Sequence, residues 1–150
     1  MYGSIYKEVL SNHLFWVTCI AWCLAQSLKV IFGVIRTKKF DFRWFIGTGG
    51  MPSAHASGAS ALAITTGFDY GFNSGIFALA FFFAMVTMFD AQGVRRSTGS
   101  QARILNRVME DIYFKGKIQE ERLKELIGHT PVEVIAGSII GVLIAIIFQR

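Results

Sequence analysis

The 150-residue sequence is poor in charged residues, proline and cysteine. Charged residues make up 17% of the chain and apolar residues 53%, whereas an average soluble domain carries roughly a quarter charged residues. This balance excludes an intrinsically disordered chain. The length leaves room for about one domain, which excludes a multidomain soluble enzyme. We therefore expect a single small integral-membrane domain covering residues 1–150.

The two cysteines, Cys19 and Cys23, lie four residues apart within one apolar run. Without partner cysteines or other ligands they form neither a disulfide framework nor a metal site, so we interpret them as packing residues. The run that contains them, 14–35, is too long for the apolar part of a signal peptide. No small-residue cleavage motif follows it, and we expect it to be retained.

Four long apolar runs predict the fold. The first would reach about 33 Å as a helix, enough to cross a hydrocarbon core of about 30 Å. The second is rich in alanine, serine and glycine, which suits close helix packing in a bilayer. We predict an all-α fold, a polytopic membrane helix bundle of about four transmembrane helices at residues 14–35, 52–72, 75–89 and 132–148, with a very short turn between the second and third.

Most of the 15 basic residues lie in two loops. The first covers 36–43 and the second about 91–128, while the turn between the second and third runs holds none. With four crossings, both loops lie on one side, and the positive-inside rule places that side in the cytoplasm. We expect a multi-pass protein of a bacterial cell membrane with its site on the cytoplasmic face. Basic residues that bind substrate would weaken this inference.

The second basic loop has a helical pattern of its own. Apolar residues recur at spacings of three and four between 102 and 127, which predicts an amphipathic helical loop on one face of the bundle. Glycine and lysines at 115–117 divide it into two pieces. The loop would either pack as a helical hairpin over the bundle mouth or lie on anionic lipid. The sequence leaves both alternatives open.

Two histidines stand at the starts of predicted helices. A glycine turn precedes Pro52 and His55, and another precedes His129 and Pro131. Proline suits the first turn of a helix, and the unbonded N–H groups and dipole at a helix N-terminus favour an anion. Both helix starts face the basic loops. Two histidines, two helix N-termini and several arginines on one face suggest a phosphate site.

The same residues also have structural interpretations. Thr130 and Glu133 form the T-x-x-E pattern of a capping box, Ser53 suits a helix N-cap, and Asp90 can pair with nearby arginines. However, Glu133 follows His129 by four residues. Its carboxylate could therefore hold one imidazole nitrogen while the other nitrogen faces substrate, as a nucleophilic or basic histidine requires.

Three short motifs resemble those of one family. The segment Pro-Ser-Ala-His at 52–55 resembles the Pro-Ser-Gly-His motif of the type 2 phosphatidic acid phosphatase superfamily, which includes the vanadium haloperoxidases. His129 and Glu133 resemble its His-x-x-x-Asp motif. Lys29, at a depth where ionisable groups are usually functional, and Arg36 resemble its Lys-x6-Arg-Pro element, with threonine in place of proline. The sequence is similar to a divergent branch of this superfamily over residues 20–142.

Several positions depart from the family pattern. The arginine that the family places six residues before its nucleophilic histidine is Leu123 here, so Arg95 or Arg96 would supply that guanidinium. Glutamate at 133 lengthens the orienting arm, and Ala54 adds a methyl beside an amide expected to approach phosphate. These departures leave open a catalytically inactive membrane scaffold that binds phosphate or lipid.

The resemblance implies a membrane-embedded lipid phosphate phosphatase. His129 would attack phosphorus to form a phosphohistidine while Glu133 holds its tautomer, and His55 would protonate the leaving alkoxide and then activate water. No carboxylate cluster of metal-ligand type accompanies the histidines, so we expect neither a metal nor another cofactor. The cations would neutralise the phosphate oxygens. The expected substrate-binding residues are Lys29, Arg36, Ser53, Asp90, Arg95 and Arg96.

The expected partners are a lipid phosphate substrate and membrane lipid. A cytoplasmic site favours a phosphomonoester, with phosphatidylglycerol phosphate ranked before phosphatidic acid; undecaprenyl diphosphate is the extracytoplasmic alternative. Nucleic acid is not expected, because the basic residues flank spanning segments, and no internal repeat supports a transporter. The small-residue second run would serve either an internal contact or a homodimer interface, and we expect a homodimer.

Overall fold

The structure is a computed structural model that describes residues 2–40, 50–113 and 128–150. Within these ranges the chain is all-α, and it is a helical membrane protein as predicted. The helices are α1 (Tyr2–Leu10), α2 (His13–Thr37), α4 (Ala54–Tyr70), α5 (Gly75–Gln92), α6 (Val94–Tyr113) and α7 (Pro131–Ile147).

The four apolar runs correspond to α2, α4, α5 and α7. Helices α2 and α5 are each long and apolar enough to cross a membrane, and α7 is a shorter apolar helix. The short turn predicted between the second and third runs joins Tyr70 to Gly75. It contains Gly71 with a φ of +88°, a conformation that suits glycine. The hydroxyl of Ser74 then caps α5 by accepting the N–H of Phe77 at 3.2 Å.

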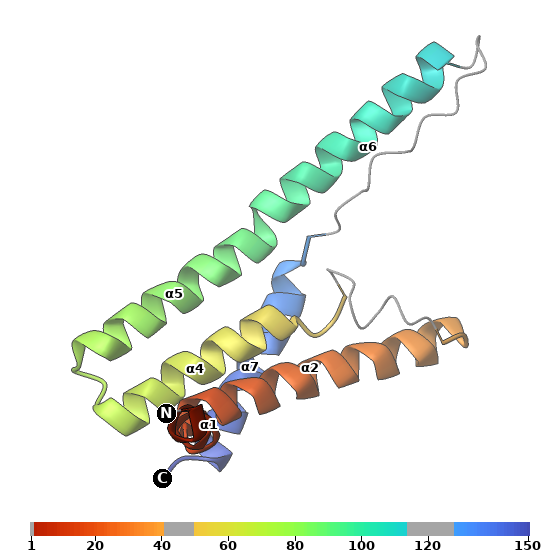
Figure 1. The fold of residues 1–150 in the computed structure, drawn as a ribbon. Coiled ribbons are helices and arrows are strands. Elements are labelled where there is room, and N and C mark those ends of the chain that lie inside the picture. Colours follow the sequence, from red (N-terminus) through yellow and green to blue (C-terminus); the bar gives the residue numbers. More distant parts are fainter. Residues whose placement is uncertain (1, 41–49, 114–127) are drawn as a thin grey trace.

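Helix α4 lies at the centre of the bundle, with α2, α5 and α7 packed around it (Figure 1). Eleven of its 17 residues are buried. Its small side chains let α7 approach closely: a methyl group at Gly137 would collide with the carbonyl of Ser53, and one at Gly141 with that of Ser57. Glycines four residues apart are a common contact motif between membrane helices. The small-residue run therefore serves an internal contact, the first of its two expected uses.

Large apolar side chains point away from α4. Leu79 and Phe89 on α5 and Ile135 and Leu143 on α7 are each more than half exposed. A monomeric soluble protein rarely leaves so much apolar surface uncovered. In a bilayer this surface contacts lipid, and the helices associate through the close packing of small residues. The placement of small residues inside and large apolar residues outside is that of a membrane bundle.

The two cysteines on α2 are free. Cys19 is half-buried and Cys23 is exposed. Cys19 therefore packs within the bundle, as interpreted from the sequence. Cys23 does not, because it lies on the outer surface of α2.

The amphipathic loop begins earlier than the pattern predicted. Helix α6 starts at Val94, immediately after Gly93, whereas the apolar spacing placed its start near Ala102. Residues 94–101 include only one apolar side chain, so they show no period. The described part of the loop, α6, continues the direction of α5 away from the bundle and does not cover its mouth (Figure 1). Contact with anionic lipid stays a prediction. The second half of the loop, 114–127, lies outside the described residues.

Candidate active site

The start of α7 positions His129 and Glu133. Thr130 is the N-cap: its hydroxyl accepts the N–H of Glu133 at 3.4 Å, while the Glu133 carboxylate accepts the N–H of Thr130 at 3.0 Å. This is a capping box, and Pro131 opens the helix as predicted. The same carboxylate oxygen, Oε2, lies 3.1 Å from Nδ1 of His129. Glu133 therefore caps the helix and contacts the imidazole at once, which confirms the capping box, while its role in catalysis stays a prediction.

The imidazole of His129 is fixed within the bundle. The residue is 1% exposed, and its backbone N–H donates to the carbonyl of Ala91, at the end of α5, at 3.0 Å. Because an ionised carboxylate can only accept hydrogen bonds, Nδ1 carries the hydrogen that it shares with Glu133. In the neutral ring this leaves the lone pair on Nε2, which is the tautomer that a nucleophilic histidine needs.

The start of α4 is bonded to the start of α7. Ser53 caps α4 by accepting the N–H of Ala56 at 3.3 Å, and its own backbone N–H donates to the carbonyl of Glu133 at 3.0 Å. Helix α4 begins at Ala54, so Pro52 precedes the N-cap. The prediction that Pro52 occupies the first helical position is therefore wrong. The positive ends of two helix dipoles therefore meet in one place, which favours an anion.

His55, in the first turn of α4, lies across from His129. The two ring centroids are 6.3 Å apart and the ring planes are inclined by 62°. His55 is half-buried. At this distance one phosphoryl group can contact both imidazoles. The structure thus brings together the two histidines that the sequence placed at one phosphate site, while their chemical roles stay predictions.

Lys29 belongs to the same cluster. The residue is 8% exposed in the interior of the bundle. Its aliphatic stem lies against Gly50, where an added methyl group would approach Cγ of Lys29 to 3.4 Å. Gly50 also has a φ of +87°. The backbone conformation therefore favours glycine just before the Pro-Ser-Ala-His segment.

The remaining predicted substrate-binding residues lie farther out or outside the described residues. Arg36 is exposed in the last turn of α2, on the same side as Lys29 and about 10 Å farther along the helix axis. Asp90 is half-buried in the last turn of α5. The side chains of Arg95 and Arg96 are outside the described residues, as is position 123. Among the described residues, no three His, Cys, Asp or Glu side chains are grouped to hold a metal ion.

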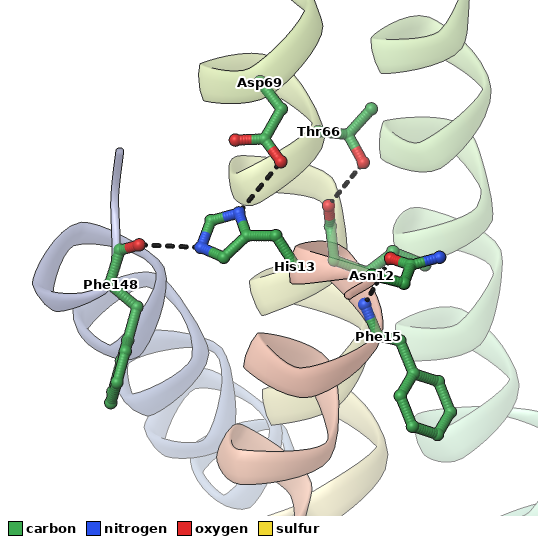
Figure 2. Close-up of polar contacts among 7 residues, drawn as sticks. Asn12, His13, Phe15, Thr66, Asp69 and Phe148 are labelled. Atoms are coloured by element: carbon green, nitrogen blue, oxygen red, sulfur yellow. Dashed lines mark hydrogen bonds and ion pairs between the residues drawn. The ribbon is translucent and has the colours of Figure 1, made fainter. Parts of the chain in front are cut away.

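A second histidine–carboxylate pair, at the other end of the bundle, was missed by the sequence analysis. Nδ1 of His13 lies 2.9 Å from Oδ2 of Asp69, and its Nε2 lies 2.8 Å from the carbonyl oxygen of Phe148 (Figure 2). A signal was present: His13 precedes the first apolar run and Asp69 ends the second. In antiparallel neighbouring helices those two positions lie at the same end.

The fold and the site define a class: an all-α membrane protein with a buried lysine and a histidine pair at one end of its bundle. The chain belongs to the Divergent PAP2 family, which it matches over residues 10–144, and this confirms the resemblance found in the motifs. It is 36% identical over 151 residues to the uncharacterized membrane protein YuiD of Bacillus subtilis (strain 168); the alignment covers 93% of this chain and 96% of that protein. No solved structure matches the chain.

Proposed function

We propose that the protein is a membrane-embedded phosphatase that hydrolyses a lipid phosphomonoester through a phosphohistidine intermediate. The observation that carries the proposal is the geometry of one cluster: His129 is held by Glu133 at 3.1 Å, and its ring centroid lies 6.3 Å from that of His55. The Glu133 carboxylate completes the capping box of α7 and also sets the tautomer of His129, so that Nε2 carries the lone pair. A nucleophilic histidine that faces a general acid requires this tautomer.

In the proposed reaction, Nε2 of His129 attacks phosphorus as the bond to the lipid oxygen breaks. His55, protonated, gives its proton to the departing alkoxide, and the lipid alcohol leaves. The neutral His55 then takes a proton from water as that water attacks the phosphohistidine, which releases inorganic phosphate and restores His129. In both steps Glu133 stabilises the positive charge that the His129 ring carries.

Phosphoryl transfer depends mainly on positioning and on charge stabilisation at the phosphate oxygens. The buried ammonium of Lys29 and the two helix starts at Ser53 and Thr130 supply positive potential beside the histidines. Arg36, Arg95 and Arg96 are the proposed additional cations, and arginine suits this role because its guanidinium binds two oxygens at once.

The location of the cluster favours a lipid substrate. The histidines lie at one end of a bundle whose outer surface is apolar, so a phosphate bound there is level with lipid headgroups. The described parts of the basic loops begin at this end, after Thr37 and at Val94, and by the positive-inside rule this supports a cytoplasmic site. We therefore rank phosphatidylglycerol phosphate first and phosphatidic acid second, with undecaprenyl diphosphate as the alternative from the opposite leaflet.

One observation favours a second candidate, a scaffold that binds lipid phosphate without turnover. Ala54 is 1% exposed at the first helical position of α4, where the Pro-Ser-Gly-His motif of the type 2 phosphatidic acid phosphatase superfamily has glycine. Its methyl therefore occupies enclosed space next to a backbone amide expected to approach phosphate. A pocket narrowed in this way could hold a phosphate and yet not admit the transition state.

The test is phosphate release by the purified protein in detergent from phosphatidylglycerol phosphate, phosphatidic acid and undecaprenyl diphosphate. Wild type should release phosphate from at least one of them, and His129→Ala should lose about 10³-fold or more in rate. His13→Ala, which removes a histidine from the opposite end, is the matched control. Equal rates for wild type and His129→Ala would contradict the mechanism, and phosphate binding without release from any substrate would identify the scaffold.

A further inference from the structure

The cluster at the opposite end joins three helices through one imidazole. His13 is the first residue of α2, Asp69 lies in the last turn of α4, and Phe148 is the C-cap of α7. The ring of His13 lies between the Asp69 carboxylate and the Phe148 carbonyl, 2.9 Å from one and 2.8 Å from the other (Figure 2). Both contacts link residues far apart in sequence, so they bear on how the helix ends are held together.

The hydrogen-bonding capacity of these groups determines how many protons the cluster contains. A backbone carbonyl can only accept, so Nε2 of His13 must carry a hydrogen. An ionised Asp69 can also only accept, so Nδ1 must then carry a second hydrogen and the ring is an imidazolium. If the ring is neutral, Nδ1 is an acceptor and Asp69 must be protonated. In either case the two bonds require one proton more than a neutral histidine beside an ionised aspartate would hold.

We propose that His13, Asp69 and the Phe148 carbonyl form a proton-dependent clasp, which holds the ends of α2, α4 and α7 together only while that extra proton is bound. When the proton leaves, the neutral ring of His13 has a single N–H, so either Nδ1 presents a lone pair to the Asp69 carboxylate or Nε2 presents one to the Phe148 carbonyl. One of the two bonds is then lost, and α7 or α4 separates from the start of α2. This inference concerns the end opposite the histidine pair and does not rest on the proposed phosphatase function.

The surroundings allow the clasp to exchange its proton with water. The side chains of His13 and Asp69 are 12% and 19% exposed, so the pair is partly accessible. Helix α1 lies at this end, as do both ends of the chain (Figure 1). Helix α5 begins here without a charged residue. Among the side chains that the structure describes on the elements at this end, the other charged or titratable ones are Tyr6, Lys7, Glu8, Tyr70 and Arg150.

The first test is the thermal unfolding of the full-length protein in detergent between roughly pH 5 and pH 9, the range in which an ordinary histidine gains or loses its proton. The folded clasp binds a proton that a neutral histidine and an ionised aspartate release on unfolding, so raising the pH destabilises the fold. One lost hydrogen bond is worth about 1 kcal/mol, so we expect the Tm of wild type to fall by about 2–4 °C across this range.

Two variants separate the proton from the hydrogen bonds. His13→Gln removes the imidazole ring. The Tm of this variant should be lower than that of wild type at acidic pH, and it should lack the fall with rising pH that the clasp causes in wild type. Asp69→Asn supplies an amide N–H that donates to Nδ1 of a neutral ring, so both bonds persist without the extra proton. Its Tm should stay close to the acidic wild-type value as the pH rises. Glu8→Gln removes a different carboxylate near this end and should keep the wild-type fall.

The second test needs no variant that might fail to fold. With histidine and aspartate isotopically labelled, the nitrogen and carboxyl NMR signals of the wild-type protein report where the proton resides. The chain has three histidines, which keeps assignment tractable. At pH 6 the clasp requires either a doubly protonated His13 ring or a protonated Asp69. A neutral His13 ring beside an ionised Asp69 at that pH would overturn the proposal, as would a wild-type Tm no more sensitive to pH than that of His13→Gln.

Discussion

The two ends of the bundle use the same chemical pair in different ways. At one end Nδ1 of His129 lies 3.1 Å from Glu133, and at the other Nδ1 of His13 lies 2.9 Å from Asp69. Glu133 is four residues from its histidine and is also fixed by a capping box. Asp69 comes from a different helix, 56 residues away in sequence.

Whether the carboxylate comes from the same helix as its histidine or from another helix distinguishes the proposed catalytic pair from the structural pair. Glu133, in the first turn of α7, contacts Nδ1 of His129 locally, and in the proposed mechanism Nε2 faces the substrate. His13 instead has both ring nitrogens bonded to acceptors on other helices. It can act on no substrate without breaking a contact that holds the bundle. A histidine–carboxylate pair therefore indicates catalysis only when the second ring nitrogen is not also used for structure.

The largest effect should come from His55→Ala at the histidine pair. Without its general acid, release of a lipid alkoxide should slow by about 10³-fold. An aryl phosphate, whose leaving group needs no proton, should still give an initial burst of the aryl alcohol. Rapid-mixing kinetics with both substrates measures the contrast. His13→Ala should leave the ratio of the two burst rates at its wild-type value. An equal slowing of the burst phase for both substrates in His55→Ala would remove His55 from the role of acid.

Exchanging the two carboxylates for amides should sharpen the comparison. Glu133→Gln should lower phosphatase activity by about 10²-fold, because the charge that stabilises the His129 cation is lost. Its Tm should hardly change, since glutamine also completes a capping box. Asp69→Asn should do the reverse, keeping the activity of wild type and losing the pH dependence of unfolding. A large drop in Tm for Glu133→Gln, without loss of activity per folded molecule, would reduce Glu133 to a cap.

The contact between α4 and α7, which connects the two ends, should be the next most sensitive. Gly137→Ala and Gly141→Ala force a methyl group against a backbone carbonyl and should each lower the free energy of unfolding by about 1–3 kcal/mol. Gly137→Ala should also lower activity, because it displaces Ser53 from the site. Gly75→Ala is the matched control, since an added methyl there meets open space. Denaturant titration in detergent measures all three, and equal stability for Gly141→Ala and Gly75→Ala would contradict the packing.

The smallest effect is expected in the middle of the bundle. The hydroxyl of Ser57 on α4 donates to the carbonyl of Ala21 on α2 at 2.9 Å. Ser57→Ala should lower the free energy of unfolding by about 1 kcal/mol. Thr87→Ala removes a hydroxyl that bonds within its own helix, to Phe83 at 2.8 Å, and should change the free energy of unfolding less. The reverse order in the same titration would show that this contact between helices does not contribute.

The sequence was sufficient for features that depend on neighbouring residues. Thr130, Pro131 and Glu133 identify the start of α7 because a capping box and an N-terminal proline are local patterns. The four long apolar runs identify α2, α4, α5 and α7 for the same reason. The meeting of His55 and His129 follows from topology, since both begin helices that start on one side of the membrane.

Features that depend on distant residues were not predictable in this way. Two backbone hydrogen bonds hold the site together: the Ser53 N–H donates to the Glu133 carbonyl, and the His129 N–H donates to the Ala91 carbonyl. Because nearly every residue has a backbone N–H and a carbonyl, the sequence does not indicate which of them pair. The start of α6 was placed late because its first turns lack apolar residues. The partner of His13 could be inferred only after the helices had been arranged side by side.

The most direct test of the central claim is to trap the intermediate. Purified His55→Ala, incubated with an aryl phosphate, should form the phosphohistidine and hydrolyse it slowly, because no general base activates water. Mass spectrometry of the alkali-stable peptides should then find one phosphoryl group on His129, and none in the His55→Ala, His129→Ala double variant. A phosphoryl group on another residue, or an unmodified His129 in a preparation whose wild type turns over, would contradict the account.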